Sequence, residues 1–251
     1  MDINEVTGKK INRHPWECSR TSCILSEITP FIRQLEAADT RALRFVDIGP
    51  GDLYFDRCLL RSFPAHELYA VDIGYKGTKQ FRPNILLCRM LEETEAYGLD
   101  YALMMDSLEY MPDDLSYLKE LCSRVRAGGY LFFTVPAFRF LFSEHDRIVK
   151  NLRRYNRKDF EALVARAGHL RVVRTHYFYS SLFLVRLTQK VLRLPIDPEH
   201  KVTTGWQYTR THPLTRLAVT ALNMDYRIHE TLAKHGIYLP GLSLFVICQK
   251  I

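Results

Sequence analysis

The sequence predicts an α/β fold, in which a Rossmann-like, mostly parallel sheet carries helices on both faces. From Arg44 onward, short apolar runs alternate with helical patterns, which is the order of elements in βαβ units. The apolar runs are hydrophobic at nearly every position, which indicates strands buried on both faces. The chain has 251 residues, of which 47% are hydrophobic and 25% charged. This composition excludes disordered and collagen-like proteins and is sufficient for one large core.

The elements follow one another with little intervening chain. The strands predicted in the first half are Phe45–Ile48, Leu68–Asp72, Asn84–Cys88 and Tyr101–Met105. A helix over Asp52–Ser62 joins the first two strands, and Pro64 stops it. Asp113 and Asp114 favour the start of another helix, and we expect Gly128 and Gly129 to end it.

The second half continues the pattern and then departs from it. Its predicted elements are a strand at Tyr130–Val135, a helix at Arg157–Ala167, and strands at Leu170–Tyr177 and Leu244–Cys248. More than sixty residues separate the last two strands, which is too long for a plain crossover, and helices are predicted near Ser181–Leu194 and Pro213–His235. We therefore expect an N-terminal helical lid over residues 1–40 and one domain over residues 41–251, with a helical insertion at about 180–240.

Charge is divided unevenly along the chain. The net charge of +7 combines 14 basic and 20 acidic residues in Met1–Ser123 with 21 basic and 8 acidic residues in Arg124–Ile251. The six cysteines form no CxxC pair, and the first twenty residues contain no apolar segment, so a reduced, cytoplasmic protein is predicted. His14, Cys18 and Cys23 match no familiar zinc spacing, and we expect no metal.

Two features point to a nucleoside-containing cofactor. Asp47-Ile48-Gly49-Pro50-Gly51 joins a strand to a helix, and glycines in such a turn let a ligand approach the backbone amides. Asp72 ends the next strand, 21 residues after Gly51, where a carboxylate can accept hydrogen bonds from a ribose diol. A dinucleotide fingerprint would place a third glycine at position 54, which is Tyr54 here, so an NAD-dependent oxidoreductase is the less favoured alternative.

Several motifs together resemble one family. Val46–Gly51 is similar to its glycine-rich motif and Ala70–Asp72 to its ribose-binding motif. Further matches are Leu103–Asp114, Ala127–Leu131 with Val135-Pro136, Arg153-Arg154-Tyr155 before Ala167-Gly168, Leu239–Leu244 and, weakly, Arg13–Glu17 with Arg20. Over most of its length the chain resembles class I S-adenosylmethionine-dependent methyltransferases, in particular a bacterial small-molecule branch of the type 11/12 kind.

The resemblance implies a fold and a cofactor site. It implies seven strands in the order 3-2-1-4-5-7-6, with the last strand antiparallel, and S-adenosyl-L-methionine as cofactor. The implied cofactor-binding residues are Asp47, Gly49, Gly51, Asp72, Ile73, Met90, Leu91, Met105, Asp106 and Ser107. For Met90, Leu91 and Met105, plain core packing is an equal alternative. Leu53 replaces the usual third glycine, and Asn151 and Tyr110 replace two common histidines, so a catalytically degenerate binding subunit is also considered.

The acceptor is expected to be a small molecule methylated on oxygen or nitrogen. His145 and Tyr155 are the candidates for a catalytic base, and the candidate substrate residues are Trp16, Arg20, Glu144, Arg153, Arg154 and His176. Arg124–Arg174 holds 12 basic and 4 acidic residues, which favours either a solvated surface or recognition of an anionic acceptor.

Nucleic acid is disfavoured as a partner because the strand ending at Met105 carries no motif for a flipped base. No apolar run is long enough to span a bilayer, but the aromatic run Tyr177–Phe183 with Arg186, Lys190 and Arg193 suggests contact with a membrane surface. The oligomeric state is not predicted.

Overall fold

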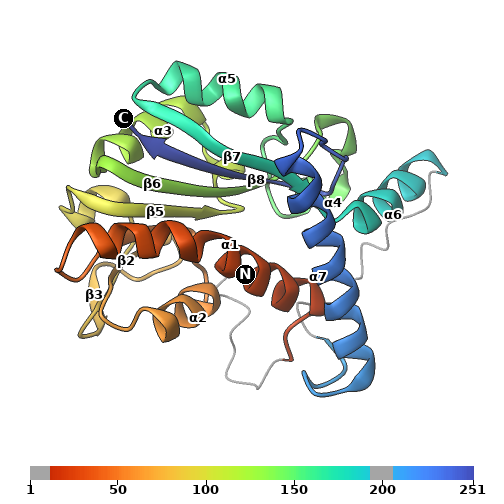
Figure 1. The fold of residues 1–251 in the computed structure, drawn as a ribbon, viewed down its shortest axis with the longest axis horizontal. Helices are drawn as coiled ribbons and strands as arrows, with labels where there is room; N and C mark the ends of the chain where they lie inside the picture. Colours follow the sequence, from red (N-terminus) through yellow and green to blue (C-terminus); the bar gives the residue numbers. More distant parts are fainter. Residues whose placement is uncertain (1–11, 193–205) are drawn as a thin grey trace.

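A computed structural model describes residues 12–192 and 206–251. One twisted sheet of eight strands separates two layers of helices, with α1, α2 and α7 on one face and α3 and α5 on the other (Figure 1). The strands are β1 Arg44–Ile48, β2 Glu67–Val71, β3 Lys79–Arg82, β4 Ile85–Cys88, β5 Leu99–Met105, β6 Val125–Pro136, β7 Leu170–Phe178 and β8 Ser243–Lys250. The α-helices are α1 Pro15–Ala38, α2 Tyr54–Ser62, α3 Asp114–Arg124, α4 Glu144–Ile148, α5 Arg157–Ala167, α6 Ser180–Val191 and α7 Pro213–Lys234. Short 3₁₀ turns are η2 Leu91–Thr94, η3 Leu108–Tyr110 and η4 Arg139–Leu141.

The strand order is β3-β4-β2-β1-β5-β6-β8-β7. The order expected for seven strands is confirmed, and β8 pairs antiparallel with both of its neighbours, β6 and β7. The predicted strand count is wrong by one, because β3 adds an antiparallel edge to β4. All four residues of β3 are exposed, so this strand lacks the apolar run by which the other strands are recognised.

Each buried strand contributes to two separate cores. In β1, Phe45 faces the helices α1, α2 and α7, whereas the next residue, Val46, faces α3 and α5. Both side chains are fully buried, which explains why the strand is apolar at consecutive positions. On α1, Ile24, Ile28 and Ile32 recur every fourth residue and are fully buried as well. The second half of α1 is therefore part of the helical layer on the sheet, while the predicted division into a lid and a domain stays a prediction.

Two predicted helix limits are wrong, and backbone geometry gives the reason. The helix after β1 begins at Tyr54, because Gly51 and Leu53 both adopt left-handed conformations that no α-helix contains. The helix from Asp114 ends at Arg124, and Gly128 and Gly129 lie inside β6. A Cβ atom at Gly129 would lie 2.6 Å from the carbonyl oxygen of Asp100. The glycine therefore serves close strand packing rather than helix termination.

The chain between β7 and β8 forms the two predicted helices, α6 and α7. Arg193 and Leu194, at the end of the first predicted helix, lie outside the described residues. Glu27 of α1 links α7 to the rest of the fold. It accepts hydrogen bonds from Tyr226 Oη on α7 at 2.6 Å and from His176 Nε2 on β7 at 2.9 Å. In the described parts of the chain, no helix combines the length and apolarity required to cross a bilayer. All six cysteines are free thiols.

Candidate active site

The glycine turn after β1 forms one wall of the site. Gly49 and Gly51 have φ angles of 75° and 59°, values that are strained for residues with a side chain. The amide of Gly49 donates to the Val71 carbonyl oxygen at 2.8 Å, which holds the turn against the end of β2. A Cβ atom on Gly49 would lie 2.9 Å from Cβ of Ser107, the second residue after β5. The turn thus packs backbone directly against the neighbouring strand exit, and only glycine fits.

Asp72 faces this turn from the end of β2. Its Oδ2 atom accepts a hydrogen bond from the amide of Gly51 at 3.1 Å, and its Oδ1 atom accepts from the amide of Gly74 at 2.8 Å. The hydroxyl of Tyr75 donates to the Gly51 carbonyl oxygen at 3.0 Å and ties the two loops together. The carboxylate is partly exposed, so its remaining lone pairs can accept hydroxyl donors from a ligand.

Buried polar atoms without partners gather around the same place. Asp47 Oδ1, Ser107 Oγ and Glu109 Oε2 are buried and make no hydrogen bond within the described residues. Burial, together with the nearby carboxylate of Asp56, raises the pKa of Asp47 well above its usual range. Burial first, and the charge of Asp106 second, raises the pKa of Glu109. Because unpartnered buried polar atoms are costly, this cluster is suited to a polar ligand that supplies the missing partners.

The start of α1 covers the glycine turn. Arg20 forms an ion pair with Asp106, and its guanidinium also donates to Thr134 Oγ1 at 3.3 Å. The Thr134 hydroxyl in turn donates to Asp106 Oδ1 at 2.9 Å. The guanidinium of Arg20 lies 5.0 Å from the ring centroid of Trp16, and Arg13 pairs with Asp52 beside the turn. These contacts bring the sequence-predicted Trp16 and Arg20 to the site.

Comparison with known proteins identifies the family to which this chain belongs. A family model described as a methyltransferase domain matches residues 23–191, about two thirds of the chain. This chain belongs to that methyltransferase family. No curated protein matches the sequence. The family assignment makes the chain an S-adenosyl-L-methionine-dependent methyltransferase, and the NAD-dependent alternative finds no support.

Solved structures share the fold at low sequence identity. One is a Galdieria sulphuraria protein provisionally named sarcosine dimethylglycine methyltransferase, with a TM-score of 0.53, 13% identity, and 90% of this chain and 85% of that chain covered. Another is the plantazolicin methyltransferase BpumL, solved with a monoazolic desmethyl analogue and SAH, with a TM-score of 0.51, 10% identity, and coverage of 92% and 84%. Both likenesses confirm the Rossmann-like methyltransferase fold.

The residues expected around the adenine and methionine portions of the cofactor divide into two groups. Ile73 and Met90 are 80% and 54% exposed and are therefore free to contact a ligand at the edge of this methyltransferase. Leu91 is only 2% exposed and packs in the core on the α3 side, which favours its structural interpretation. Met105 is half-buried at the end of β5, and the hydroxyl of Thr134 approaches its sulfur at 3.8 Å.

The two predicted catalytic bases are not brought to the glycine turn by any observed contact. Tyr155 is buried and donates its hydroxyl hydrogen to Asp114 Oδ2 at 2.8 Å, which fixes it on the α3 side. Burial and this bond raise the pKa of Tyr155. His145 lies in α4, where burial, and then the charge of Arg186, lowers its pKa. Neither side chain contacts Asp72, Asp106 or Gly49, so the structure supports neither as a base.

Most predicted substrate residues from the second half of the methyltransferase are engaged elsewhere. Arg154 holds the buried Asp146 with two hydrogen bonds of 2.8 and 3.0 Å, and Arg153 pairs with Asp114 at 2.8 Å. Glu144 is exposed and pairs with Arg147 at 2.7 Å. His176 is 1% exposed, with both ring nitrogens occupied by Glu27 and by the carbonyl oxygen of Tyr177. Each of these side chains therefore has a partner within the chain, and their assignment to substrate binding stays a prediction.

Glu109 and Thr134 are the residues that the sequence analysis passed over. The sequence did contain a signal for Glu109, because a carboxylate in the apolar stretch between Leu108 and Tyr110 follows a buried strand by four residues. Thr134 carried no distinctive signal, since a threonine inside a strand is ordinary. Both lie at the carboxyl ends of the central strands, where open α/β sheets bind ligands. Within residues 12–192 and 206–251, no three potential ligands come together as a metal site.

Proposed function

We propose that this methyltransferase transfers a methyl group from S-adenosyl-L-methionine to an oxygen or nitrogen atom of a small molecule. The observation that carries the proposal is the cradle of Gly49, Gly51 and Asp72, which presents backbone against the ligand and a carboxylate to a diol. This cradle fits the nucleoside of the cofactor, with Asp72 accepting from the ribose hydroxyls and Ile73 and Met90 flanking the adenine.

The other end of the cradle fits the amino acid portion of the cofactor. Asp47 and Asp106 supply carboxylate oxygens suited to the ammonium group, and Arg20 supplies a guanidinium suited to the carboxylate. The burial of Asp47 makes a cationic ligand particularly favourable, because the ammonium would stabilise the ionised carboxylate that burial now disfavours. Ser107 Oγ lies beside the glycine turn and is available as a further partner.

Catalysis then depends mainly on alignment. The bound cofactor supplies an activated methyl group on a positively charged sulfur, with its own leaving group. The protein has to hold the acceptor atom in line with the methyl group, exclude water and accept one proton. We propose Glu109, rather than His145 or Tyr155, as the proton acceptor, because its Oε2 is buried, unpartnered and close to Asp106. Its raised pKa predicts turnover that increases with pH as the carboxyl group ionises.

The acceptor remains a small molecule in this proposal, but an anionic acceptor loses support. Arg153, Arg154 and Arg157 each form an ion pair with a carboxylate of the same chain. The charge of these three arginines is therefore already compensated within the chain. The interpretation of this segment as a structural and solvated surface is the better one.

Cofactor binding tests the proposal directly. S-adenosylhomocysteine should raise the melting temperature of the wild-type chain, whereas NAD should not. Asp72→Ala should abolish this shift, because the ribose diol loses its acceptor, while Asp159→Ala on the exposed start of α5 should retain it. Stabilisation by NAD alone, or an unchanged response of Asp72→Ala, would contradict the proposed site.

Turnover tests the second half of the proposal and the degenerate-subunit alternative. A library of small alcohols, amines and carboxylic acids is screened for release of S-adenosylhomocysteine. Once an acceptor is found, Glu109→Gln should keep cofactor affinity and lower kcat by roughly 10²–10⁴-fold. Absence of release with every acceptor tested, with cofactor binding intact, would favour a binding subunit, for which the left-handed Leu53 in the glycine motif is the supporting observation.

A further inference from the structure

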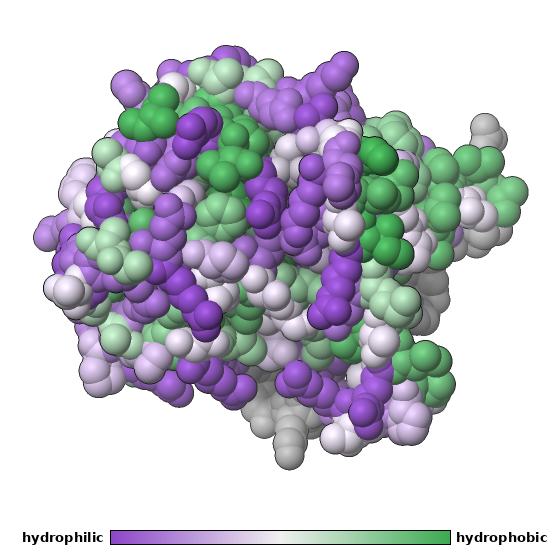
Figure 2. Space-filling view, viewed as in Figure 1, coloured by the Kyte–Doolittle hydropathy of each residue, from purple (hydrophilic) through white to green (hydrophobic). Residues whose placement is uncertain are grey.

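Helices α6 and α7 share an apolar surface that is turned to solvent, which we call the α6–α7 face. Figure 2 shows hydrophobic side chains gathered where these two helices project beyond the sheet. Every member is at least half exposed. The α6–α7 face consists of Leu184, Val185, Val191 and Leu192 from α6 and its end, and Leu214, Leu217, Met224 and Ile228 from α7.

The exposed residues of α7 lie on one stripe of the helix. Leu217, Ala221, Met224 and Ile228 follow one another at intervals of four, three and four, which places them on the same side. The opposite side of α7 is also occupied, because Tyr226 is buried against α1 and β7. A helix that only covered a core would carry polar residues on its outer side. The outer stripe of α7 therefore has a function besides packing.

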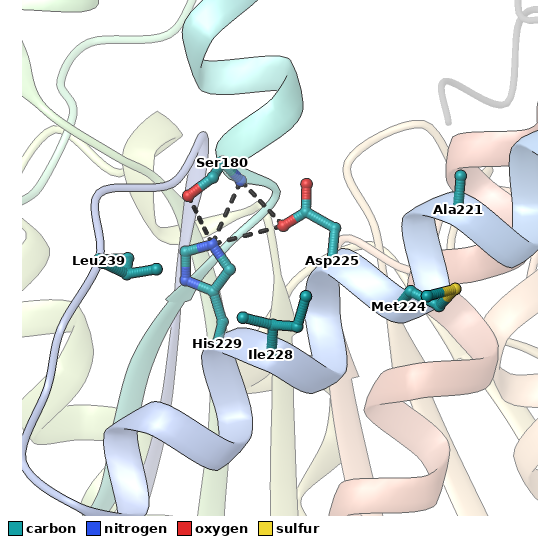
Figure 3. Close-up of a pocket in the computed structure, with 7 residues that line it drawn as sticks. All are labelled: Ser180, Ala221, Met224, Asp225, Ile228, His229 and Leu239. Atoms are coloured by element: carbon teal, nitrogen blue, oxygen red, sulfur yellow. Dashed lines mark hydrogen bonds and ion pairs between the residues drawn. The ribbon is translucent and has the colours of Figure 1, made fainter.

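The two helices are fixed to each other by a polar cluster beneath the α6–α7 face. Asp225 accepts from the backbone amides of Ser180 and Ser181 at 3.0 and 2.8 Å and thereby caps the start of α6. Figure 3 shows this cluster, which lines a cavity of about 380 Å³ together with Met224 and Ile228. Ser180, Asp225 and His229 do not form a catalytic triad, because serine and aspartate approach the same imidazole nitrogen, Nε2. The cluster holds the helices in a rigid arrangement.

Positive charge borders the face. Arg216, Arg227 and Lys234 lie about 90–110° around α7 from the centre of its apolar stripe, all on the same side. Arg216 and Arg227 form no ion pair with any described residue, and Lys234 pairs with Glu230. In residues 180–192 and 206–239 the carboxylates are Asp225 and Glu230, and both are engaged within the chain. An apolar stripe beside uncompensated cations complements an anionic amphiphilic surface.

The same charges disfavour a second copy of the chain as the occupant. Two α7 stripes packed together would bring Arg216 and Arg227 of one copy near a like-charged row of the other, and the described residues 180–192 and 206–239 hold no free carboxylate to compensate. The aromatic run Tyr177–Phe183 is not the contact surface that the sequence suggested. Tyr177, Phe178, Tyr179 and Phe183 are all buried, and Arg193 lies outside the described residues. Lys190 donates to the carbonyl oxygens of Phe140, in η4, and of Phe142 just after it.

We propose that the α6–α7 face docks on the surface of an anionic lipid bilayer. The helices lie in the interface with their apolar side chains among the acyl chains, while Arg216 and Arg227 meet the anionic headgroups. The face lies at the carboxyl ends of the parallel strands, because α6 follows β7 directly and contacts η4 beyond β6. Docking would place the methyl-transfer site close to the membrane surface. This inference goes beyond the proposed function and does not depend on it.

Vesicle flotation with the whole chain tests the proposal. The wild type should float with vesicles of equal parts phosphatidylglycerol and phosphatidylcholine, and bind those of phosphatidylcholine alone far more weakly. The double variant Leu217→Glu/Ile228→Glu should lose binding to both. Arg216→Gln/Arg227→Gln should bind the anionic vesicles about 25-fold less well, since each surface cation contributes about fivefold.

Matched controls separate docking from misfolding. Ile251→Glu changes an exposed apolar residue elsewhere, and Lys79→Gln/Arg82→Gln removes two cations from β3, so both should float like the wild type. Each variant should keep the wild-type melting temperature within the measurement error. Equal binding by Leu217→Glu/Ile228→Glu would overturn the proposal. A wild type that does not bind vesicles would also overturn the proposal. This holds if the wild type sediments as a monomer, and equally if it sediments as a dimer that the Leu217→Glu/Ile228→Glu variant dissociates.

Discussion

The two halves of this chain use their charged residues in opposite ways. In the acidic half, Asp47 and Asp72 gather with Asp106 around a glycine turn, and Asp47 Oδ1 is buried without a hydrogen-bond partner among the described residues. In the basic half, Arg153, Arg154 and Arg157 each meet a carboxylate of the same chain. The unpartnered oxygen of Asp47 belongs to the ligand site, whereas these three paired arginines belong to the scaffold. The density of charged residues in the sequence does not distinguish a ligand site from a scaffold. The partner that each charged side chain meets in the structure does.

Breaking the buried ion pair of the basic half should have the largest effect on stability. Arg154→Met would leave Asp146, which is fully buried, without its guanidinium and should lower the free energy of unfolding by about 3–5 kcal/mol. Urea unfolding measures the loss, and calorimetry with S-adenosylhomocysteine should give an unchanged Kd.

Arg153→Met is the matched control, because its ion pair with Asp114 is more exposed and should contribute about 1 kcal/mol or less. A stable Arg154→Met variant with impaired turnover would instead show that this arginine recognises substrate. That result would erase the contrast between the two halves.

Closing the glycine turn should have the next largest effect, and on binding. Gly49→Ala places a methyl group against Ser107 at a φ of 75°, and should weaken the binding of S-adenosylhomocysteine by about 10–100-fold. Gly77→Ala provides the control, since it has a φ of 73° and no atom within 4 Å of the added Cβ. Calorimetry should show binding close to wild type for this control. Equal losses in both variants would mean that backbone strain, not the close approach to Ser107, explains the result.

The buried acids predict a pH dependence of intermediate size. Burial raises the pKa of Asp56 to about 6, above the value near 3.9 of an unfolded chain. The stability contributed by its protonated form is present below pH 4 and is lost as pH rises through 6. Asp56→Asn should therefore exceed the wild type in unfolding free energy by about 1–2 kcal/mol at pH 7, and by little at pH 4. Chemical denaturation at the two pH values measures this difference, and a gap that does not grow with pH would refute the assignment.

Restoring the third glycine should have the smallest effect. Leu53 has a φ of 61°, which is strained for leucine, yet its side chain is buried against α1 and α2. In Leu53→Gly the relief of strain, about 1–2 kcal/mol, offsets most of the lost burial, so we expect a net change within about 1 kcal/mol and unaltered cofactor binding. Leu59→Ala, a buried residue with ordinary helical geometry, should cost about 2–5 kcal/mol in the same unfolding measurement.

The sequence predicted what depends on local pattern. The strands buried on both faces, the glycine turn and Asp72 all have signatures within a few residues, and their positions relative to one another follow from the chirality of βαβ units. The strand β3 was not predicted, because an exposed edge strand needs no apolar residues. The family resemblance implied the insertion of β8 between β6 and β7, which no single segment reveals.

The catalytic and substrate assignments that stay predictions depend on which partner each side chain meets. His176 and Tyr155 are typical catalytic residue types, but Glu27 and Asp114, far away in sequence, engage them. Arg154 is occupied by Asp146 in the same manner. Pairings of this kind are decided by tertiary structure, and a single sequence contains no direct record of them. Glu109 shows the converse, since its importance lies in having no partner for one oxygen atom.

The central position of β8 has a consequence for how the protein is made. Among the eight strands β8 is synthesised last, yet it pairs with β6 over seven residue positions and with β7 over eight. Until it emerges from the ribosome, β6 and β7 cannot be joined, and each leaves a hydrophobic edge unpaired. The first six strands in chain order, β1 to β6, can pair during synthesis, whereas β7 has no strand partner until β8 is made. A nascent chain at this stage is a natural client for a chaperone that shields exposed strand edges.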